Sequence, residues 1–330
     1  MDKYLIRFAM NSEIPSIMKF IGEHWKKNHI LSYDRSFFEW QYMSDKLDYV
    51  IGMDDEKKIH GMLAFISYDS TDKRDIATSM WKAQEGSGFL GIKMLLYLLD
   101  ECPHRVLFSP GINIKTSEQI YRRMGILTGT MKQWYRLRDI SDYKIATISV
   151  KTIPRRSSQI NGNFIRYQTF SDLLSTFNYD KYVTKDMIPY KSRIYFEKRY
   201  FQHPSYQYLV YGVERDGEVR AVIVLRIQKC NGSQAIRFVD CLGNYAEIAY
   251  ATAGLDLLLD EFDAEYVDMY ESGLSDEMLR GAGWLPVKES GNIIHNYFSP
   301  FEQRVVDIHY CTSNPDIVLF RGDGDQDRPN

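Results

Sequence analysis

The pattern of hydrophobic and polar residues over the first 137 positions predicts strands and helices in alternation. Apolar runs of strand character occupy residues 4–9, 48–67, 76–83, 105–111 and 133–137, and a polar turn divides the second of them into a hairpin. Apolar residues at helical spacing occupy residues 12–25, 90–99 and 115–125. Ser12 with Pro15, Thr116 with Gln119, and Gly125 are typical residues of helix ends. The first half therefore predicts an α/β (α+β) domain.

The second half repeats this plan. SFFEWQY, at residues 36–42, matches IYFEKRY, at residues 194–200, in three letters, and a hairpin with a charged turn follows both. The strand AIRFVDCLG and the helix after it then take the place of residues 78–99, and Gly283 takes the place of Gly125. The order and spacing of the elements agree as well as the letters, which favours an internal duplication. The polar segment 149–163 reads as the linker between the halves.

Composition and charge exclude several classes of protein. The chain has 330 residues, 44% of them hydrophobic, which is enough for two domains with full cores. Its 41 basic and 44 acidic residues are spread along the chain, so no nucleic-acid groove is predicted. The four cysteines match no metal or redox spacing, and no apolar run approaches the roughly 20 residues that span a bilayer. We expect a cytoplasmic protein, monomeric or homodimeric, with no metal site.

Three glycines, Gly86, Gly88 and Gly91, lie where the strand 76–83 meets the helix 90–99. Such a turn leaves the first amides of the helix unpaired, and together with the helix dipole they suit a diphosphate. Glycine lets the ligand approach the main chain without a Cβ in the way. A tight structural turn is the alternative interpretation. A dinucleotide fold is disfavoured, because the turn follows several strands and not the first strand of a βαβ unit.

The order of elements, the segment WKAQEGSGFLG (residues 81–91) and the segment IYRRMGI (residues 120–126) resemble the GNAT superfamily of acyl-CoA-dependent N-acyltransferases. The resemblance covers residues 4–137 directly and the second half through the repeat. It implies two domains in tandem, each a mixed, mostly antiparallel twisted sheet flanked by helices. The expected boundaries are 1–145 for the coenzyme-binding domain, 146–163 for the linker, 164–322 for a degenerate domain that shapes the acceptor site, and 323–330 for a polar tail.

The resemblance also implies a coenzyme, acetyl-CoA, and residues that hold it. The loop departs from the family pattern, because Glu85 replaces an Arg or Gln and Leu90 replaces a small residue. Tyr121 matches the tyrosine that protonates the departing thiolate, whereas the second half has Leu279 at that place. The predicted coenzyme-binding residues are Met80, Trp81, Lys82, Ala83, Glu85, Gly86, Ser87, Gly88, Phe89, Leu90, Gly91, Asn113 and Tyr121.

The acceptor amine needs a base, and the strand before the glycine turn offers no carboxylate. Candidates lie between the first two helices of the first half and at strand ends of the second half, and structural roles are the alternative for each. The predicted acceptor-side residues are His24, Trp25, His29, Asp34, Trp40, Asp240 and Glu271, with His29 and Asp240 as candidate catalytic groups. His295 reads as a strand residue. Asp323, Asp325 and Asp327 alternate in the tail, but a calcium loop would need a further glutamate and a following helix. We expect a solvated or loosely docked tail, with a lid or acceptor contact as the alternative.

A tandem enzyme of this kind resembles those that acetylate amino sugars, carried on a nucleotide, for bacterial surface glycans. Two alternatives stay open. A Fem-type aminoacyl transferase also pairs two such domains, but it has a long helical hairpin that is not visible here. A non-catalytic protein that binds acyl-CoA is the other, although the glycine turn and Tyr121 are both retained.

Overall fold

The computed structural model describes residues 3–154, 162–298, 301 and 304–329. The chain divides into two compact units. The described residues of Met1–Thr128, Tyr310–Pro315 and Gly324–Asn330 form unit 1, and those of Gly129–His309 and Asp316–Asp323 form unit 2. The first unit therefore ends before the predicted boundary at residue 145, and it takes in two segments from the C-terminal end of the chain.

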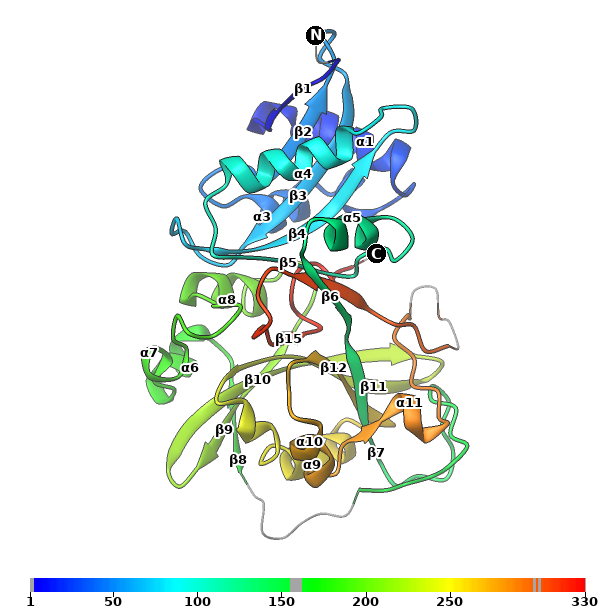
Figure 1. The fold of residues 1–330 in the computed structure, drawn as a ribbon. Coiled ribbons are helices and arrows are strands. Elements are labelled where there is room, and N and C mark those ends of the chain that lie inside the picture. Colours follow the sequence, from blue (N-terminus) through cyan, green and yellow to red (C-terminus); the bar gives the residue numbers. More distant parts are fainter. Residues whose placement is uncertain (1–2, 155–161, 299–300, 302–303, 330) are drawn as a thin grey trace. The chain divides into compact units, whose positions relative to one another are not determined.

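Unit 1 is built on a mixed sheet with the strand order β1-β2-β3-β4-β5-β14-β6 (Figure 1). The strands are β1 (Leu5–Phe8), β2 (Tyr49–Met53), β3 (Ile59–Ser67), β4 (Asp75–Ala83), β5 (Val106–Pro110), β6 (Leu127–Thr130) and β14 (His309–Thr312). The helices are α1 (Ile14–His24), α2 (Ile30–Tyr33), α3 (Arg35–Tyr42), α4 (Leu90–Glu101) and α5 (Ser117–Arg123). Strands β4 and β5 pair in parallel, whereas β1 to β4 form antiparallel neighbours.

Helix α4 covers one face of this sheet, and α1 and α3 lie on the other (Figure 1). The apolar residues of α4 recur at helical spacing, and four of them are buried against the strands: Leu90, Met94, Leu95 and Leu98. This packing fixes the start of α4 next to the end of β4, which is where the glycine turn lies. The core of unit 1 thus holds the turn in place.

Unit 2 contains a second mixed, mostly antiparallel sheet, with the order β13-β7-β12-β11-β10-β9-β8 and with β15 paired to β12. Its strands are β7 (Lys132–Leu137), β8 (Asn163–Tyr167), β9 (Leu209–Arg215), β10 (Glu218–Cys230), β11 (Ser233–Gly243), β12 (Tyr266–Ser272), β13 (Leu285–Pro286) and β15 (Leu319–Phe320). Its helices are α6 (Phe170–Thr176), α7 (Tyr179–Tyr182), α8 (Arg193–Tyr200), α9 (Thr252–Glu261), α10 (Asp276–Gly281) and α11 (Val287–Ser290). The predicted fold class of two mixed, mostly antiparallel sheets flanked by helices is confirmed.

The two sheets have the same order when β8 to β12 are set against β1 to β5, each with one parallel pair in the same place. One strand in each sheet comes from the other half of the sequence. Strand β7, predicted to complete the first domain, pairs with β12 of unit 2, and β14 from the end of the chain pairs with β5 of unit 1. The linker was predicted over 146–163, with its polar segment at 149–163, and residues 155–161 of it lie outside the described part of the chain.

Among the described residues, the structure contains no helix with the length and apolar character required to cross a bilayer.

Candidate functional site

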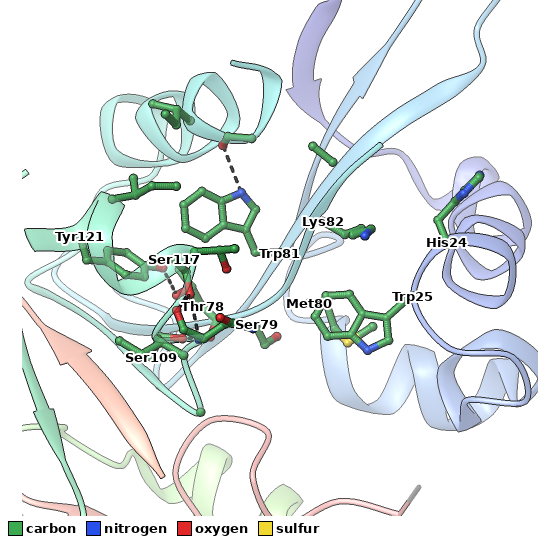
Figure 2. Close-up of a pocket in the computed structure, with 18 of the residues that line it drawn as sticks. His24, Trp25, Thr78, Ser79, Met80, Trp81, Lys82, Ser109, Ser117 and Tyr121 are labelled. Carbon is green, nitrogen blue, oxygen red and sulfur yellow. Dashed lines mark hydrogen bonds between the residues drawn. The ribbon is translucent and has the colours of Figure 1, made fainter. Parts of the chain in front are cut away.

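A cavity of about 760 Å³ opens in unit 1 where β4 and β5 separate (Figure 2). The two strands pair from Asp75 to Ala77 on β4, and beyond this point their ladder ends. The hydroxyl of Ser109 then donates to the carbonyl of Thr78 at 2.8 Å, so a side chain replaces the strand pairing there. The wall of the cavity continues along β4 to the glycine turn. Such a gap between strands can admit an extended ligand that pairs with the free main chain.

Strand β4 is irregular at this gap. Ser79 lies opposite Ala64 and Lys82 lies opposite Met62, so β4 has one more residue than β3 between these two pairs. The extra residue forms a bulge at Met80, whose φ of 47° is in the left-handed region. Bulges with backbone strain are found beside functional sites, where they redirect main-chain groups. Met80, Trp81, Lys82 and Ala83, predicted to hold the coenzyme, all line the cavity.

The glycine turn forms the end of the cavity. Gly86 and Gly88 have φ values of 79° and 61°, and a Cβ on either would meet no atom within 4 Å. Among the described residues, no hydrogen bond is found for the amides of Gly86, Gly88 and Phe89. Helix α4, 12 residues long, begins directly after them, so its dipole adds to these unpaired donors. The turn combines open space with the groups that bind a phosphate.

The structure places most, but not all, of the predicted loop residues on the cavity. Glu85, Gly86, Gly88, Gly91 and the more distant Asn113 line it. Ser87, Phe89 and Leu90 do not. The hydroxyl of Ser87 donates to the carbonyl of Gln84 at 2.5 Å, Phe89 projects into solvent, and Leu90 packs into the core below α4. These three side chains shape the turn, whereas its glycines line the cavity.

Tyr121, on α5, lies on the far side of β4 from α1 and reaches the cavity from there (Figure 2). Its hydroxyl lies 3.0 Å from that of Thr78, and its ring packs against Trp81 with 5.5 Å between centroids. Burial raises the pKa of Tyr121 well above its ordinary value. The phenol is therefore protonated throughout the physiological range, the state that a proton donor requires.

His24 and Trp25, at the end of α1, line the cavity on the other side of β4 (Figure 2). The His24 side chain lies 2.8 Å from the amide nitrogen of Gln84, and the indole of Trp25 is 41% exposed. Both residues were predicted on the acceptor side of the site. Gln84, which follows β4 directly, was not identified from the sequence although it also lines the cavity.

His29, Asp34 and Trp40, also predicted on the acceptor side, do not line the cavity, and each has a structural contact. The Nδ1 atom of His29 accepts a hydrogen bond from the amide of Leu31 at 3.2 Å and so caps α2. A carboxylate oxygen of Asp34 accepts from the amide of Phe37 at 2.8 Å and caps α3. The indole of Trp40 packs against Phe37. Helix capping and packing explain the choice of these residues.

His29 makes the stability of the protein depend on pH. Burial lowers the pKa of His29 to about 4, and the positive charges of Arg328 and Lys26 add to the shift. Because the unfolded chain then binds the proton more tightly, stability falls as the pH drops from about 6.5 to about 4.

We expect His29→Gln to remove this loss of stability. For a pKa shift of this size, the free energy of unfolding of the wild-type protein falls by roughly 3 kcal/mol over the range. Thermal melts across this pH range measure it. His104→Gln, in which a half-buried ring bonded to the carbonyl of Cys102 is removed, is the control. Equal slopes for both variants would contradict the assignment.

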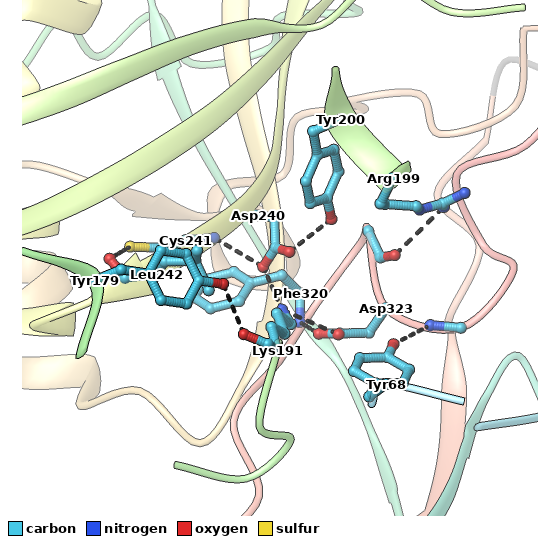
Figure 3. Close-up of polar contacts among 12 residues, drawn as sticks. Tyr68, Tyr179, Lys191, Arg199, Tyr200, Asp240, Cys241, Leu242, Phe320 and Asp323 are labelled. Carbon is cyan, nitrogen blue, oxygen red and sulfur yellow. Dashed lines mark hydrogen bonds and ion pairs between the residues drawn. The ribbon is translucent and has the colours of Figure 1, made fainter. Parts of the chain in front are cut away.

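Asp240 and Glu271 belong to unit 2, and neither is part of the cavity lining. Lys191 lies 2.5 Å from Asp240 and 3.0 Å from Asp323, and Tyr200 donates to Asp240 at 2.5 Å (Figure 3). All of these charged groups are buried, so they form an internal ion-pair network in which one lysine faces two aspartates. Glu271 accepts from the indole of Trp134 at 2.8 Å and from the amide of Leu274 at 3.0 Å, and burial raises its pKa. Structural contacts thus satisfy both predicted acceptor-side carboxylates.

The C-terminal segment, expected to be a solvated or loosely docked tail, is buried in the structure. Asp323, Asp325 and Asp327 are all buried, and Asp325, Gln326 and Arg328 line the cavity of unit 1. Gln326 donates to the carbonyl of Pro110 at 3.1 Å, and Arg328 pairs with Asp325. No group of three or more His, Cys, Asp or Glu residues in the described part of the chain is arranged to hold a metal ion. The contact with the site was kept as the alternative, and no local pattern in the sequence favoured it.

No model of a protein family matches the sequence, and no curated protein matches it significantly. Solved structures do match. A GCN5-related N-acetyltransferase from Anabaena variabilis is 10% identical with a TM-score of 0.56, over 94% of this chain and 72% of that one. One from Kribbella flavida is 9% identical with a TM-score of 0.55, over 96% and 72%. A candidate acetyltransferase from Pyrococcus horikoshii is 11% identical with a TM-score of 0.54, over 96% and 92%. At these identities the likeness concerns the fold, and the fold of this chain is that of the GCN5-related N-acetyltransferases.

Proposed function

We propose that the protein is an acyl-CoA-dependent N-acyltransferase that transfers an acetyl group to an amine. The observation that carries this proposal is the continuous cavity of unit 1, which runs from the gap between β4 and β5 to the unpaired amides of the glycine turn. An acyl-CoA has the matching parts in the same order: a thioester, an arm with amide groups, and a diphosphate. The arm would pair with the main chain near Met80–Ala83, and the diphosphate would accept from the amides between Gly86 and Gly91.

The site can support direct transfer. The amine nitrogen forms a bond to the thioester carbonyl carbon, the carbon–sulfur bond breaks, and the sulfur leaves with the bonding electrons. The Tyr121 phenol, buried beside Thr78, gives its proton to the sulfur and regains one from solvent after the product leaves. The proton of the amine goes to a base or to a water relay near the carbonyl. Residues of this chain thus supply the acid, the main-chain contacts and the anion site.

The two sheets of equal strand order support a tandem arrangement in which unit 2 is a degenerate copy. At the end of β11 the main chain of Gly243 packs against the neighbouring strand, because a Cβ on Gly243 would lie 2.5 Å from the carbonyl oxygen of Arg220, whereas a Cβ on Gly86 or Gly88 would meet no atom within 4 Å. Leu279, at the place of Tyr121, is buried in the core of unit 2. We infer that unit 1 binds the coenzyme. A role of unit 2 in shaping the acceptor site stays a prediction.

For the acceptor we propose an amino sugar, carried on a nucleotide, as used in bacterial surface glycans. The exposed indole of Trp25 offers the flat apolar surface on which sugar rings stack, and Asp325 and Arg328 add groups that bind hydroxyls and phosphates. The hydrogen bond from the Gln326 side chain to the carbonyl of Pro110, and the pairing of Arg328 with Asp325, would keep these groups in place. The proposal for the sugar depends on these residues together with the resemblance described above.

The direct experiment is to measure release of free CoA from acetyl-CoA with a set of amines. We expect turnover with at least one nucleotide-linked amino sugar and none with the N-acetylated form of the same sugar. Thermal shift is measured in parallel, since CoA at 100 times its dissociation constant adds about 2.7 kcal/mol of stability. Stabilisation by CoA without turnover of any amine would favour the non-catalytic alternative, and transfer from an aminoacyl-tRNA would favour the Fem-type one. No response to CoA would overturn the proposal.

A further inference from the structure

We propose that Asp325, in the C-terminal segment of the chain, is the base that removes the proton from the acceptor amine. This inference depends on the proposed function. An acid and a base that act in one transfer must both reach the same carbonyl carbon, so the base must lie at the level of β4 where Tyr121 bonds to Thr78. Asp325 lines the cavity, and the contacts of its segment place it at that level.

One end of the segment is fixed where β4 and β5 separate. A Cβ on Gly324 would lie 2.9 Å from the ring of Pro110 on β5 and 3.7 Å from the Cβ of Ala77 on β4. The amide of Gly324 donates to the hydroxyl of Tyr68 at 2.8 Å, which holds the main chain in this place. Ala77 is the last residue of β4 that pairs with β5. Gly324 therefore marks the point at which the gap between the strands opens.

The other end of the segment is fixed at the bulge of β4. A guanidinium nitrogen of Arg328 lies 3.6 Å from the sulfur of Met80. Asp325 lies between these two anchors along the segment, and Thr78 and Ser79 lie between the corresponding anchors along the strand. The segment thus runs beside the two residues of β4 that follow the opening of the gap. One of them, Thr78, is the partner of the candidate acid.

Neighbouring residues of β4 lead to the acid and to Asp325. The hydroxyl of Thr78 lies 3.0 Å from that of Tyr121 (Figure 2), and the hydroxyl of Ser79 lies 3.0 Å from that of Tyr42 on α3. Burial raises the pKa of Tyr42, and the negative charge of Asp325 adds to the shift, so the carboxylate lies near this second pair of hydroxyls. A base and an acid at successive residues of the strand allow the amine to enter while the thiol leaves.

The other candidate bases of the cavity lie toward the glycine turn. Among the described residues that line the cavity, His24, Glu85 and Asp325 carry an imidazole or a carboxylate. The ring of His24 lies 2.8 Å from the side chain of Gln84, which follows the end of β4, and Glu85 is the next residue, in the turn. Both belong to the end of the cavity where the diphosphate is proposed to bind. Asp325 is the candidate at the reacting end.

The contacts of the Asp325 carboxylate leave one oxygen for the amine. Oδ2 pairs with Arg328, which fixes the orientation of the group. Oδ1 accepts one long hydrogen bond among the described residues, from the side chain of Gln326 at 3.4 Å, and that side chain is held by the carbonyl of Pro110 at 3.1 Å. The proton of the amine moves to Oδ1 as the nitrogen–carbon bond forms, and it passes to solvent after the product leaves.

The test measures acetyl transfer by Asp325→Asn and Asp325→Ala to an amine that the wild-type protein accepts. We expect each variant to lose about 100-fold or more in kcat, with a much smaller change in the Michaelis constant for the amine. CoA affinity by calorimetry should be unchanged, because the diphosphate is proposed to bind at the other end of the cavity. Added formate should restore part of the rate of Asp325→Ala, because it supplies a carboxylate in the space that the substitution opens. An unfolded protein could not show this recovery.

The matched control is Asp75→Asn. Asp75 is also a buried carboxylate of unit 1 that pairs with an arginine, with 2.5 Å and 2.9 Å to nitrogens of Arg105. It lies at the start of β4 but does not line the cavity. We expect this variant to lose stability, to keep the kcat of the wild-type protein, and to show no response to formate.

Two results would overturn the inference and leave the proposed function intact. In the first, the wild-type protein transfers acetyl groups and Asp325→Asn keeps its kcat. In the second, Asp325→Asn changes only the Michaelis constant for the amine, which would make Asp325 a binding group. A wild-type protein that neither binds CoA nor transfers an acetyl group would instead remove the proposed function, and the inference with it.

Discussion

Gly88→Asp is expected to lower the affinity for CoA by about 100- to 1,000-fold. Aspartate tolerates the left-handed backbone better than most residues, and a Cβ on Gly88 would meet no atom within 4 Å, so the variant can keep its fold. Its carboxylate would occupy the space beside the unpaired amides, where it would accept their hydrogen bonds and repel the diphosphate. Two like charges about 4 Å apart near a protein surface repel by roughly 4 kcal/mol, which sets the upper end of this range. Calorimetric titration with CoA measures the effect.

Gly217→Asp is the matched control for this variant. Gly217 has a φ of 77°, and a Cβ there would also meet no atom within 4 Å. It lies in the turn between β9 and β10, so the substitution carries the same backbone strain and the same added charge without touching the candidate site. CoA affinity should be unchanged in Gly217→Asp. If Gly88→Asp bound CoA as tightly as this control, the diphosphate would not lie at the turn.

Tyr121→Phe is expected to lower kcat by about 10²- to 10⁴-fold, the usual contribution of a general acid. The Michaelis constant for acetyl-CoA should change much less, because the phenol acts on the sulfur as the bond breaks. The raised pKa of Tyr121 keeps the phenol protonated at all pH values of interest, so the variant should lower the rate equally between pH 6 and pH 9. Steady-state kinetics across this range measure both effects.

Tyr167→Phe serves as the control for the lost hydroxyl. Tyr167 is also buried and also bonds to a threonine hydroxyl, that of Thr176 at 2.6 Å, but it lies in unit 2. Its removal should cost stability without changing kcat. If the two variants had the same kcat, Tyr121 would be a packing residue and another group would protonate the thiolate.

The elements that depend on neighbouring residues could be predicted from the sequence. The glycine turn, the strand before it and the helix after it follow from neighbouring residues, because apolar spacing and backbone freedom are local signals. Tyr121 was singled out through the resemblance of residues 120–126 to a family element, and the structure places it in the short helix α5, on the wall of the cavity. The bulge at Met80 has no such signal, because a methionine with positive φ depends on the strand that lies opposite.

The non-local part could not be predicted. Strands β7 and β14 each join the sheet of the other half. Nothing in the residues of β7 indicates that this strand pairs with β12, which contains Val267, and not with β5 of its own half, which contains Leu107. For Asp240 a structural role was the alternative to an acceptor contact, and its partner proves to be Lys191, 49 residues away in sequence. The tail was expected to be solvated or loosely docked, with a lid or acceptor contact as the alternative, and in the structure Asp325 and Arg328 pair with each other and line the cavity. The strand exchange, the contacts of Asp240 and the position of the tail all depend on pairing between residues that are distant in sequence.

The central claim is that the amides of the glycine turn bind the diphosphate of CoA while the arm lies in the gap between β4 and β5. A crystal structure of the protein with CoA tests it most directly. We expect diphosphate oxygens within hydrogen-bond distance of the amides of Gly86 and Gly88, and the thiol near the hydroxyl of Tyr121. CoA bound elsewhere on the protein, or a cavity that stays without CoA at a saturating concentration, would contradict the claim.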